Sequence, residues 1–144
     1  MTTALRVKKA IVRAFINQPE LRGKQVSIGH PGSEMEPECV FITGVRNTET
    51  ARVMGKAHRR EELTVEVGIV CEVLGTDLVE TEERAWRMFE GVENGIAADS
   101  SLGGRVLIAE VTGFDQRSFN GPERNVVEIT TEIRVVANKD FEEA

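Results

Sequence analysis

The sequence predicts an α+β fold, in which a mainly antiparallel β-sheet has two helices packed on it. Two segments repeat apolar residues at helical spacing, and others alternate apolar and polar residues, as strands with one buried face do. The predicted order is helix, strand, strand, basic arm, strand, helix, strand, strand (α-β-β-arm-β-α-β-β). The 144 residues contain no linker or internal repeat. Residues 1–137 are therefore expected to form a single domain, followed by an acidic, flexible C-terminal tail at 138–144.

The first helix is predicted over residues 3–17, and Gln18-Pro19 ends it because the residue before a proline avoids helical angles. Its polar side chains share one narrow face, and apolar side chains cover the rest, interrupted by Lys8. This apolar surface is wider than the stripe of roughly 100° that one sheet needs. Either a neighbouring subunit or a long loop of the same chain then covers the excess. The candidate interface residues on this helix are Leu5, Val12 and Ile16.

The next three strands are predicted at residues 25–29, 38–45 and 63–73. A loop that contains Gly29-His30-Pro31-Gly32 separates the first two. The third strand places its apolar residues on one face, with Val70 as the exception. One apolar face and one wet face over this length are typical of an antiparallel strand.

A second helix is predicted after Gly75, capped by Thr76 or Asp77, with Glu80 at the spacing of a capping box from Asp77. Trp86 lies beside its apolar stripe and is interpreted as a ring at the edge of the core. The residues of the stripe itself are Ala85, Met88, Phe89, Val92 and Ile96.

The last two strands are predicted at residues 105–113 and 125–137. Between them, residues 115–124 are predicted to be a polar connection, because Asn120-Gly121-Pro122 is a strong turn signal.

Residues 46–62 form a basic segment between two predicted strands. They include five of the eighteen Lys and Arg residues, together with His58, although the net charge of the chain is −6. A hairpin needs only about two to five linking residues, and longer structureless connections are usually functional or disordered. We interpret the segment as a protruding arm that stays mobile until it docks on another protein surface. Its candidate interface residues are Arg46, Arg52, Lys56, Arg59 and Arg60.

The composition argues against several classes of function. A pI of about 5.1 opposes general DNA binding, which needs a cationic surface. One Trp, six Phe and no Tyr argue against an aromatic platform for sugars or single-stranded nucleic acid. No apolar run has membrane or secretory length, so we expect a cytosolic protein. Cys39 and Cys71 fall within strands and are expected to be buried and reduced, with a disulfide as the alternative.

No reaction centre can be recognised in the sequence. The protein is therefore predicted not to be an enzyme, with no catalytic residue, no cofactor and no metal site. The two histidines and two cysteines lack the paired short spacing of zinc ligands. Gly55-Lys56 lacks the upstream glycine of a phosphate-binding loop. Because a Ser or Cys nucleophile needs a nearby base, His30 and His58 on polar loops are poor candidates.

Five segments, taken with the element order, carry a resemblance to a known family. They are the helix at 4–15, Val26-Ser27-Ile28-Gly29-His30-Pro31-Gly32, Glu38-Cys39-Val40-Phe41-Ile42, Trp86-Arg87-Met88-Phe89-Glu90-Gly91-Val92-Glu93, and Leu102-Gly103-Gly104-Arg105-Val106. The chain resembles the tail terminator (tail completion) proteins of long-tailed, siphovirus-type bacteriophages. The similarity covers nearly the whole chain as a pattern of size and element order.

The resemblance implies a structural virion protein that assembles as a homo-hexameric ring. Such a ring caps the tail tube, ends tube polymerisation and provides the attachment surface for the head connector. The implied partners are further copies of the chain, the tail-tube protein and the head–tail connector protein. DNA passes through the ring without specific binding, and no membrane is involved. The implied location is the head-proximal end of the virion tail, after assembly in the host cytoplasm.

Two other interpretations remain open. A tail-tube or head–tail joining subunit has comparable size and strand content, but a tube subunit polymerises into long tubes, whereas a terminator stops at closed rings. A small-molecule-binding or enzymatic α+β domain needs a concave pocket with convergent polar groups, and the sequence offers no such cluster.

Overall fold

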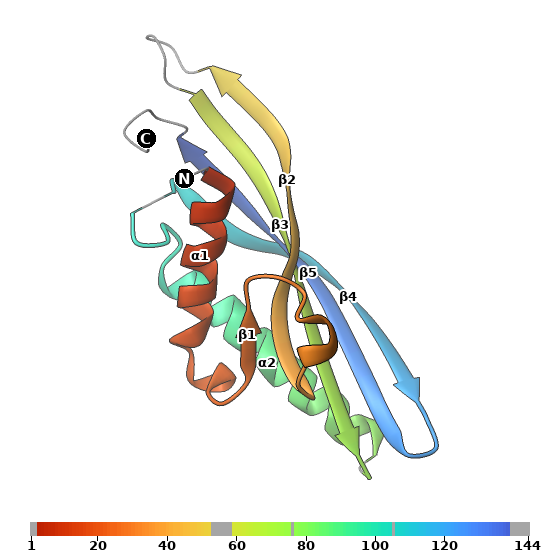
Figure 1. Cartoon of the computed structure of the whole chain (residues 1–144). Helices are drawn as coiled ribbons and strands as arrows, with labels where there is room; N and C mark the ends of the chain where they lie inside the picture. Colours follow the sequence, from red (N-terminus) through yellow and green to blue (C-terminus); the bar gives the residue numbers. More distant parts are fainter. Residues whose placement is uncertain (1–2, 53–58, 76, 105, 139–144) are drawn as a thin grey trace.

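A long, twisted five-stranded sheet has two helices packed along one of its faces (Figure 1). The computed structural model describes residues 3–52, 59–75, 77–104 and 106–138. Its helices are α1 (Thr3–Ile16) and α2 (Leu78–Ala98), with short 3-10 turns η1 (Pro19–Leu21) and η2 (Gly32–Glu34). Its strands are β1 (Gln25–Ser27), β2 (Glu38–Arg52), β3 (Arg59–Leu74), β4 (Ile108–Asn120) and β5 (Arg124–Asn138). The predicted α+β fold is confirmed.

The strand order in the sheet is β1-β2-β3-β5-β4. The four long strands pair antiparallel, as predicted, whereas the three-residue β1 runs parallel to β2. Because β1 covers only residues 39–41 of β2, the rest of β2 forms one edge of the sheet. Within the described part of the chain, the outer side of β4 forms the other.

The helix-covered face of the sheet forms the core. Alternate β3 residues from Leu63 to Cys71 are buried there, as the sequence predicts, and so are alternate β5 residues from Val127 to Val135. The residues of the predicted α2 stripe are all buried in the same core. Trp86 is half-buried against this core, which confirms its predicted place at the core's edge.

The start of α2 also follows the prediction. The Asp77 carboxylate accepts a hydrogen bond from the backbone N–H of Glu80 at 2.7 Å, which satisfies one of the free N–H groups of the first helical turn. Gly75 has a φ of 71°, a conformation that favours glycine. The chain can therefore leave β3 and enter α2 within a few residues.

In the described part of the chain, the opposite side of the sheet carries no α-helix, and we call it the open face (Figure 1). The loop between β1 and β2 crosses part of it, where the His30 ring meets the Phe41 ring edge-on with centroids 4.8 Å apart. Phe41 lies over Gly68, since a Cβ at Gly68 would be 2.7 Å from the Phe41 ring. The alternating side chains beyond this contact are mainly polar and charged.

The prediction that residues 46–62 form a non-strand arm was wrong for most of the segment. β2 continues to Arg52 and β3 begins at Arg59, and residues 60–62 also pair with β5. Residues 53–58 lie outside the described residues. Irregularities in register at Ile42/Gly44 and Asn47/Glu49 break the alternation by which a strand is recognised. Backbone pairing, which needs no apolar side chains, extends the hairpin past its core.

The predicted polar connection at 115–124 was also wrong. β4 runs to Asn120 and β5 begins at Arg124, so the turn signal was correct but the connection spans only three residues. The side chains of residues 112–120 are exposed. The segment therefore lacks the alternation of apolar and polar residues by which a strand is predicted. At the other end of β5, Asn138 still belongs to the strand, and residues 139–144 of the predicted tail lie outside the described residues.

Gly91 lies where α2 approaches η1, and its replacement tests this packing. A Cβ at Gly91 would lie 2.8 Å from Cγ of the buried Leu21. We expect Gly91→Ala to lower the free energy of unfolding by about 1–3 kcal/mol, although alanine is otherwise favoured within helices by about 1 kcal/mol. Urea denaturation measures the change, with Glu90→Ala on the exposed side as the control. A Gly91→Ala protein more stable than wild type would contradict the close approach.

Candidate assembly surfaces

Three of the five predicted arm residues come together at one end of the β2–β3 hairpin. Arg52 and Arg59 are direct backbone partners, and Arg60 follows opposite Ala51. The Arg60 side chain is exposed. Lys56 lies outside the described residues. The hairpin extends beyond the helices at the end of the sheet where α1 begins and β5 ends (Figure 1). The basic positions are therefore carried away from the core.

Arg46, the fifth predicted residue, is paired with Thr64, farther from the end of the hairpin, and its side chain lies on the open face. Its guanidinium is 3.3 Å from the Glu132 carboxylate and 3.7 Å from that of Glu66. Arg134 on β5 makes a similar set of ion pairs with Glu62 and Glu110. Exposed pairs of this kind contribute only about 0–1 kcal/mol each. The guanidinium of Arg46 is thus already ion-paired with carboxylates of its own sheet.

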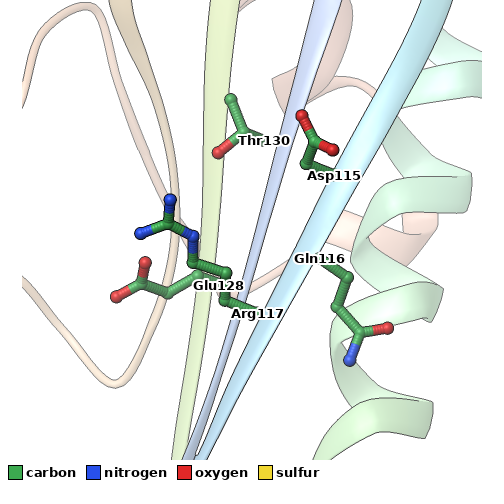
Figure 2. Close-up of a pocket in the computed structure, with 5 residues that line it drawn as sticks. All are labelled: Asp115, Gln116, Arg117, Glu128 and Thr130. Atoms are coloured by element: carbon green, nitrogen blue, oxygen red, sulfur yellow. The ribbon is translucent and has the colours of Figure 1, made fainter.

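The open face also contains an open hollow of about 500 Å³ between β4 and β5. Its lining residues are Asp115, Gln116, Arg117, Glu128 and Thr130. Figure 2 shows that Gln116 points toward α2, whereas Arg117 and Glu128 extend away from it. Ligand pockets for small organic molecules are mostly apolar and enclosed. The polar, open lining here is instead typical of solvated sheet surface.

An aromatic cluster joins the exposed part of β4 to α2. The Phe114 ring meets those of Trp86 and Phe89 edge-on, with centroids 5.0 and 5.5 Å apart. The Trp86 indole N–H donates a hydrogen bond to the Gln116 side-chain oxygen (3.2 Å), and the Gln116 amide donates to Glu82 (3.0 Å). These contacts hold β4 beside α2, although Phe114 remains 58% exposed.

Sequence reasoning missed this part of β4 as a surface because it took 115–124 for a connection. The signal that could have found it is the pair of rings at Phe114 and Phe119, five residues apart in an otherwise polar segment. Phe119 is 55% exposed and pairs in register with Val126 on β5. An exposed edge strand with aromatic side chains is a common site of protein association.

The three predicted contact residues of α1 lie in one stripe. At 3.6 residues per turn, Leu5, Val12 and Ile16 fall within a sector of about 40° on the helix. Leu5 and Ile16 are 40% and 59% exposed, while Val12 is half-buried and packs against the core. The helix therefore leaves apolar surface uncovered, and its role as a contact stays a prediction.

Glu38 at the start of β2 connects three parts of the fold. Its Oε1 accepts hydrogen bonds from Nζ of Lys24 (2.8 Å) and from Nη2 of Arg84 on α2 (2.9 Å). Burial alone raises the pKa of Glu38, but the hydrogen bonds and charges of Lys24 and Arg84 outweigh it and hold this pKa below its usual 4.5. The carboxylate therefore ties α2 and the segment before β1 to the sheet.

We expect Glu38→Gln to lower the free energy of unfolding by about 2 kcal/mol at neutral pH. Because the folded-state pKa of Glu38 lies below the unfolded one, its contribution is complete above about pH 4.5 and is lost as the pH falls through the folded value. Urea denaturation at neutral and strongly acidic pH measures this. The difference in the free energy of unfolding between wild type and Glu38→Gln should become smaller in acid. Glu36→Gln serves as an exposed control. A gap independent of pH would contradict a role for the charge.

Both cysteine thiols of the chain are buried. Cys39 and Cys71 are buried with free thiols, as expected, and no disulfide joins them. Burial, with the nearby charge of Glu36 or Glu38, raises the pKa of each thiol to about 11, so both are protonated at neutral pH. Among the described residues, no group of three or more His, Cys, Asp or Glu side chains is placed to hold a metal ion. Neither helix in that part of the chain is long and apolar enough to span a membrane.

The fold has a counterpart among solved structures. A chain in the structure of the virion of a native gene transfer agent particle matches it with a TM-score of 0.63. The match covers 93% of this chain and 96% of that chain. No family model and no curated protein matches the sequence. Because the sequence identity to the virion chain is 14%, the likeness shows a shared fold.

Proposed function

We propose that the protein is a structural component of a phage-like virion, without enzymatic activity. The observation that carries this proposal is the nearly full-length similarity of its fold to a chain of a gene transfer agent virion, over 93% of the residues. The resemblance of its sequence to tail terminators supports a finer role. In that role, a homo-hexameric ring of this chain caps the tail tube, ends tube polymerisation and presents a surface to the head–tail connector.

The β2–β3 hairpin is the proposed docking element of this ring. Arg52, Lys56, Arg59 and Arg60 are proposed to meet acidic groups on a neighbouring subunit or on the tail-tube protein. The net charge of −6 makes the rest of each identical subunit acidic on average, so a basic hairpin end has complementary surface to meet. Arg46, whose charge is engaged by its own sheet, is proposed to hold the base of the hairpin in place.

The net negative charge also supports passage of DNA through the ring. A channel wall that is cationic would bind the phosphate backbone, whereas an acidic subunit holds no DNA by this mechanism. The location that goes with the tail-terminator role is the head-proximal end of the tail, after assembly in the host cytoplasm.

A second candidate function is a tail-tube or head–tail joining subunit. The observation that favours it is the long outer edge of β4, which has no partner strand in the described chain. Uncovered edges pair readily with further copies, and pairing that does not close into a ring gives an open polymer.

Growth of tail tubes separates the two candidates. Purified tail-tube protein of the same particle is allowed to polymerise, and tube length is followed with and without this protein. A terminator shortens the tubes and remains at their ends. Incorporation along the tube, or tubes made of this protein alone, would instead establish the tube-subunit function.

A further inference from the structure

The two helices carry opposite charges. α1 contains four basic residues and no acidic one, a net charge of +4. α2 contains five glutamates and two arginines, a net charge of −3. The two helices are neighbours in one layer, since the backbone of α1 at Ala14 approaches Gly95 of α2. The helix layer of each subunit therefore has a basic side and an acidic side.

Each helix carries several charged side chains that are exposed. On α1, Lys9 and Arg13 are exposed beside the apolar stripe of Leu5 and Ile16. On α2, the exposed side chains away from the core stripe include Val79, Glu83, Glu90 and Glu93, together with one basic residue, Arg87. Among the described residues, the basic pair on α1 and these three glutamates form no ion pair. Each helix thus presents charge that its own subunit leaves uncompensated.

We propose that the outer face of α1 in one copy docks on the outer face of α2 in the next copy. The occupant of each face is a second copy of this chain, because the two faces are complementary in charge. Within one subunit the outer faces cannot meet, since the helices already pack side by side through other residues. The contact joins two different surfaces, which is the head-to-tail geometry that a closed ring requires. The inference rests on the proposed function, for which it names the subunit contact.

The apolar and charged groups have separate roles in this contact. Leu5 and Ile16 supply apolar area to bury against the neighbour, where Val79 of α2 is 64% exposed. Lys9 and Arg13 select the acidic helix of the neighbour and repel its basic one. Because the charges are exposed, salt screens them, and the ring is expected to weaken as ionic strength rises.

Two charge-reversal variants test the pairing. Lys9→Glu/Arg13→Glu makes both helix faces acidic, and Glu83→Lys/Glu90→Lys makes both basic. Each variant alone should lose ring formation on tube ends at least about tenfold relative to wild type, because every contact then joins like charges. Native mass spectrometry after chemical cross-linking counts the rings. Arg22→Glu/Arg117→Glu changes the net charge as Lys9→Glu/Arg13→Glu does, but at exposed sites outside α1 and α2, and should assemble like wild type.

Mixing the two variants is the decisive step. In an equimolar mixture, the acidic and basic copies can alternate, and every α1–α2 contact then joins opposite charges. An even-numbered ring closes with this alternation, so the mixture should regain rings that contain equal numbers of the two variants. If the outer face of α1 were instead covered by the acidic tail at 139–144 of the same chain, mixing the two variants would not restore ring formation.

The outcomes separate this inference from the proposed function. Wild-type protein that forms no ring, alone or on tube ends, would overturn the proposed function and the contact with it. Wild-type rings together with normal assembly of either reversed variant would overturn only the helix contact. Failure of the mixture to assemble, with both variants folded by circular dichroism, would also overturn it.

Discussion

Reversing the charges of Arg59 and Arg60 together should abolish tube capping while leaving the subunit folded. These residues are adjacent at the start of β3, at the end of the hairpin that extends beyond the helices. The hairpin is held by backbone pairing, so side-chain charge at its end contributes little to stability. A single exposed ion pair contributes only about 0–1 kcal/mol, but a ring repeats each contact in every subunit. Reversal then replaces several attractions with repulsions.

The Arg59→Glu/Arg60→Glu variant is assayed by its ability to stop tail-tube growth and to join heads to tails. Arg22→Glu/Arg117→Glu is the matched control, since it introduces the same change of charge away from the hairpin. Circular dichroism and urea denaturation establish that both variants fold. A folded Arg59→Glu/Arg60→Glu protein that caps tubes at the wild-type level would remove any role for hairpin charge in assembly.

Truncating Phe15 should lower the free energy of unfolding by about 3–5 kcal/mol. Phe15 is 0% exposed and belongs to the buried core cluster, so Phe15→Ala leaves a cavity in the core. Ile16 is the matched control, because the next residue on the same helix is 59% exposed. Ile16→Ala should change stability by no more than about 0.5 kcal/mol. Urea denaturation at neutral pH measures both variants.

The same two variants separate folding from assembly. Ile16→Ala keeps the fold but removes apolar area from the proposed contact, so we expect weaker ring formation at unchanged stability. A loss of stability in Ile16→Ala comparable to that of Phe15→Ala would show that Ile16 packs within its own subunit. The exposed stripe of α1 would then not be an assembly surface.

The sequence was sufficient to predict those elements whose side chains alternate between core and solvent. Leu63 to Cys71 on β3 and Val127 to Val135 on β5 face the core as their period of two requires. The Asp77 cap of α2 could be predicted because its chemistry is local, requiring only an acceptor three residues before Glu80.

The errors share one physical cause. The ends of β2, β3 and β4 project past the core, where backbone pairing continues without a buried apolar face. The described side chains there are mainly polar or exposed, and the register shifts between Ile42 and Gly44 and between Asn47 and Glu49, so no periodic signal remains. The parallel pairing of β1 with β2 was missed for a similar reason, because three residues are too few to show a pattern.

The candidate surfaces were predicted only in part. The apolar excess on α1 could be read from a helical wheel, and Leu5 and Ile16 are indeed exposed. The pairing of Arg52 with Arg59 could not be predicted, because it depends on the register of the β2–β3 hairpin, which the sequence pattern does not show. The acidic residues of α2 can be recognised in the sequence. That α2 lies beside the basic α1 in one layer is known only from the structure.

The central claim is that this chain closes a ring on the end of a tail tube. Electron microscopy of tail tubes incubated with the purified protein tests it most directly, through class averages of the tube ends. The account predicts a single cap with sixfold symmetry, containing one ring of this protein, on tubes that no longer grow. Bare tube ends, or repeated rings of this protein that continue the tube, would contradict it.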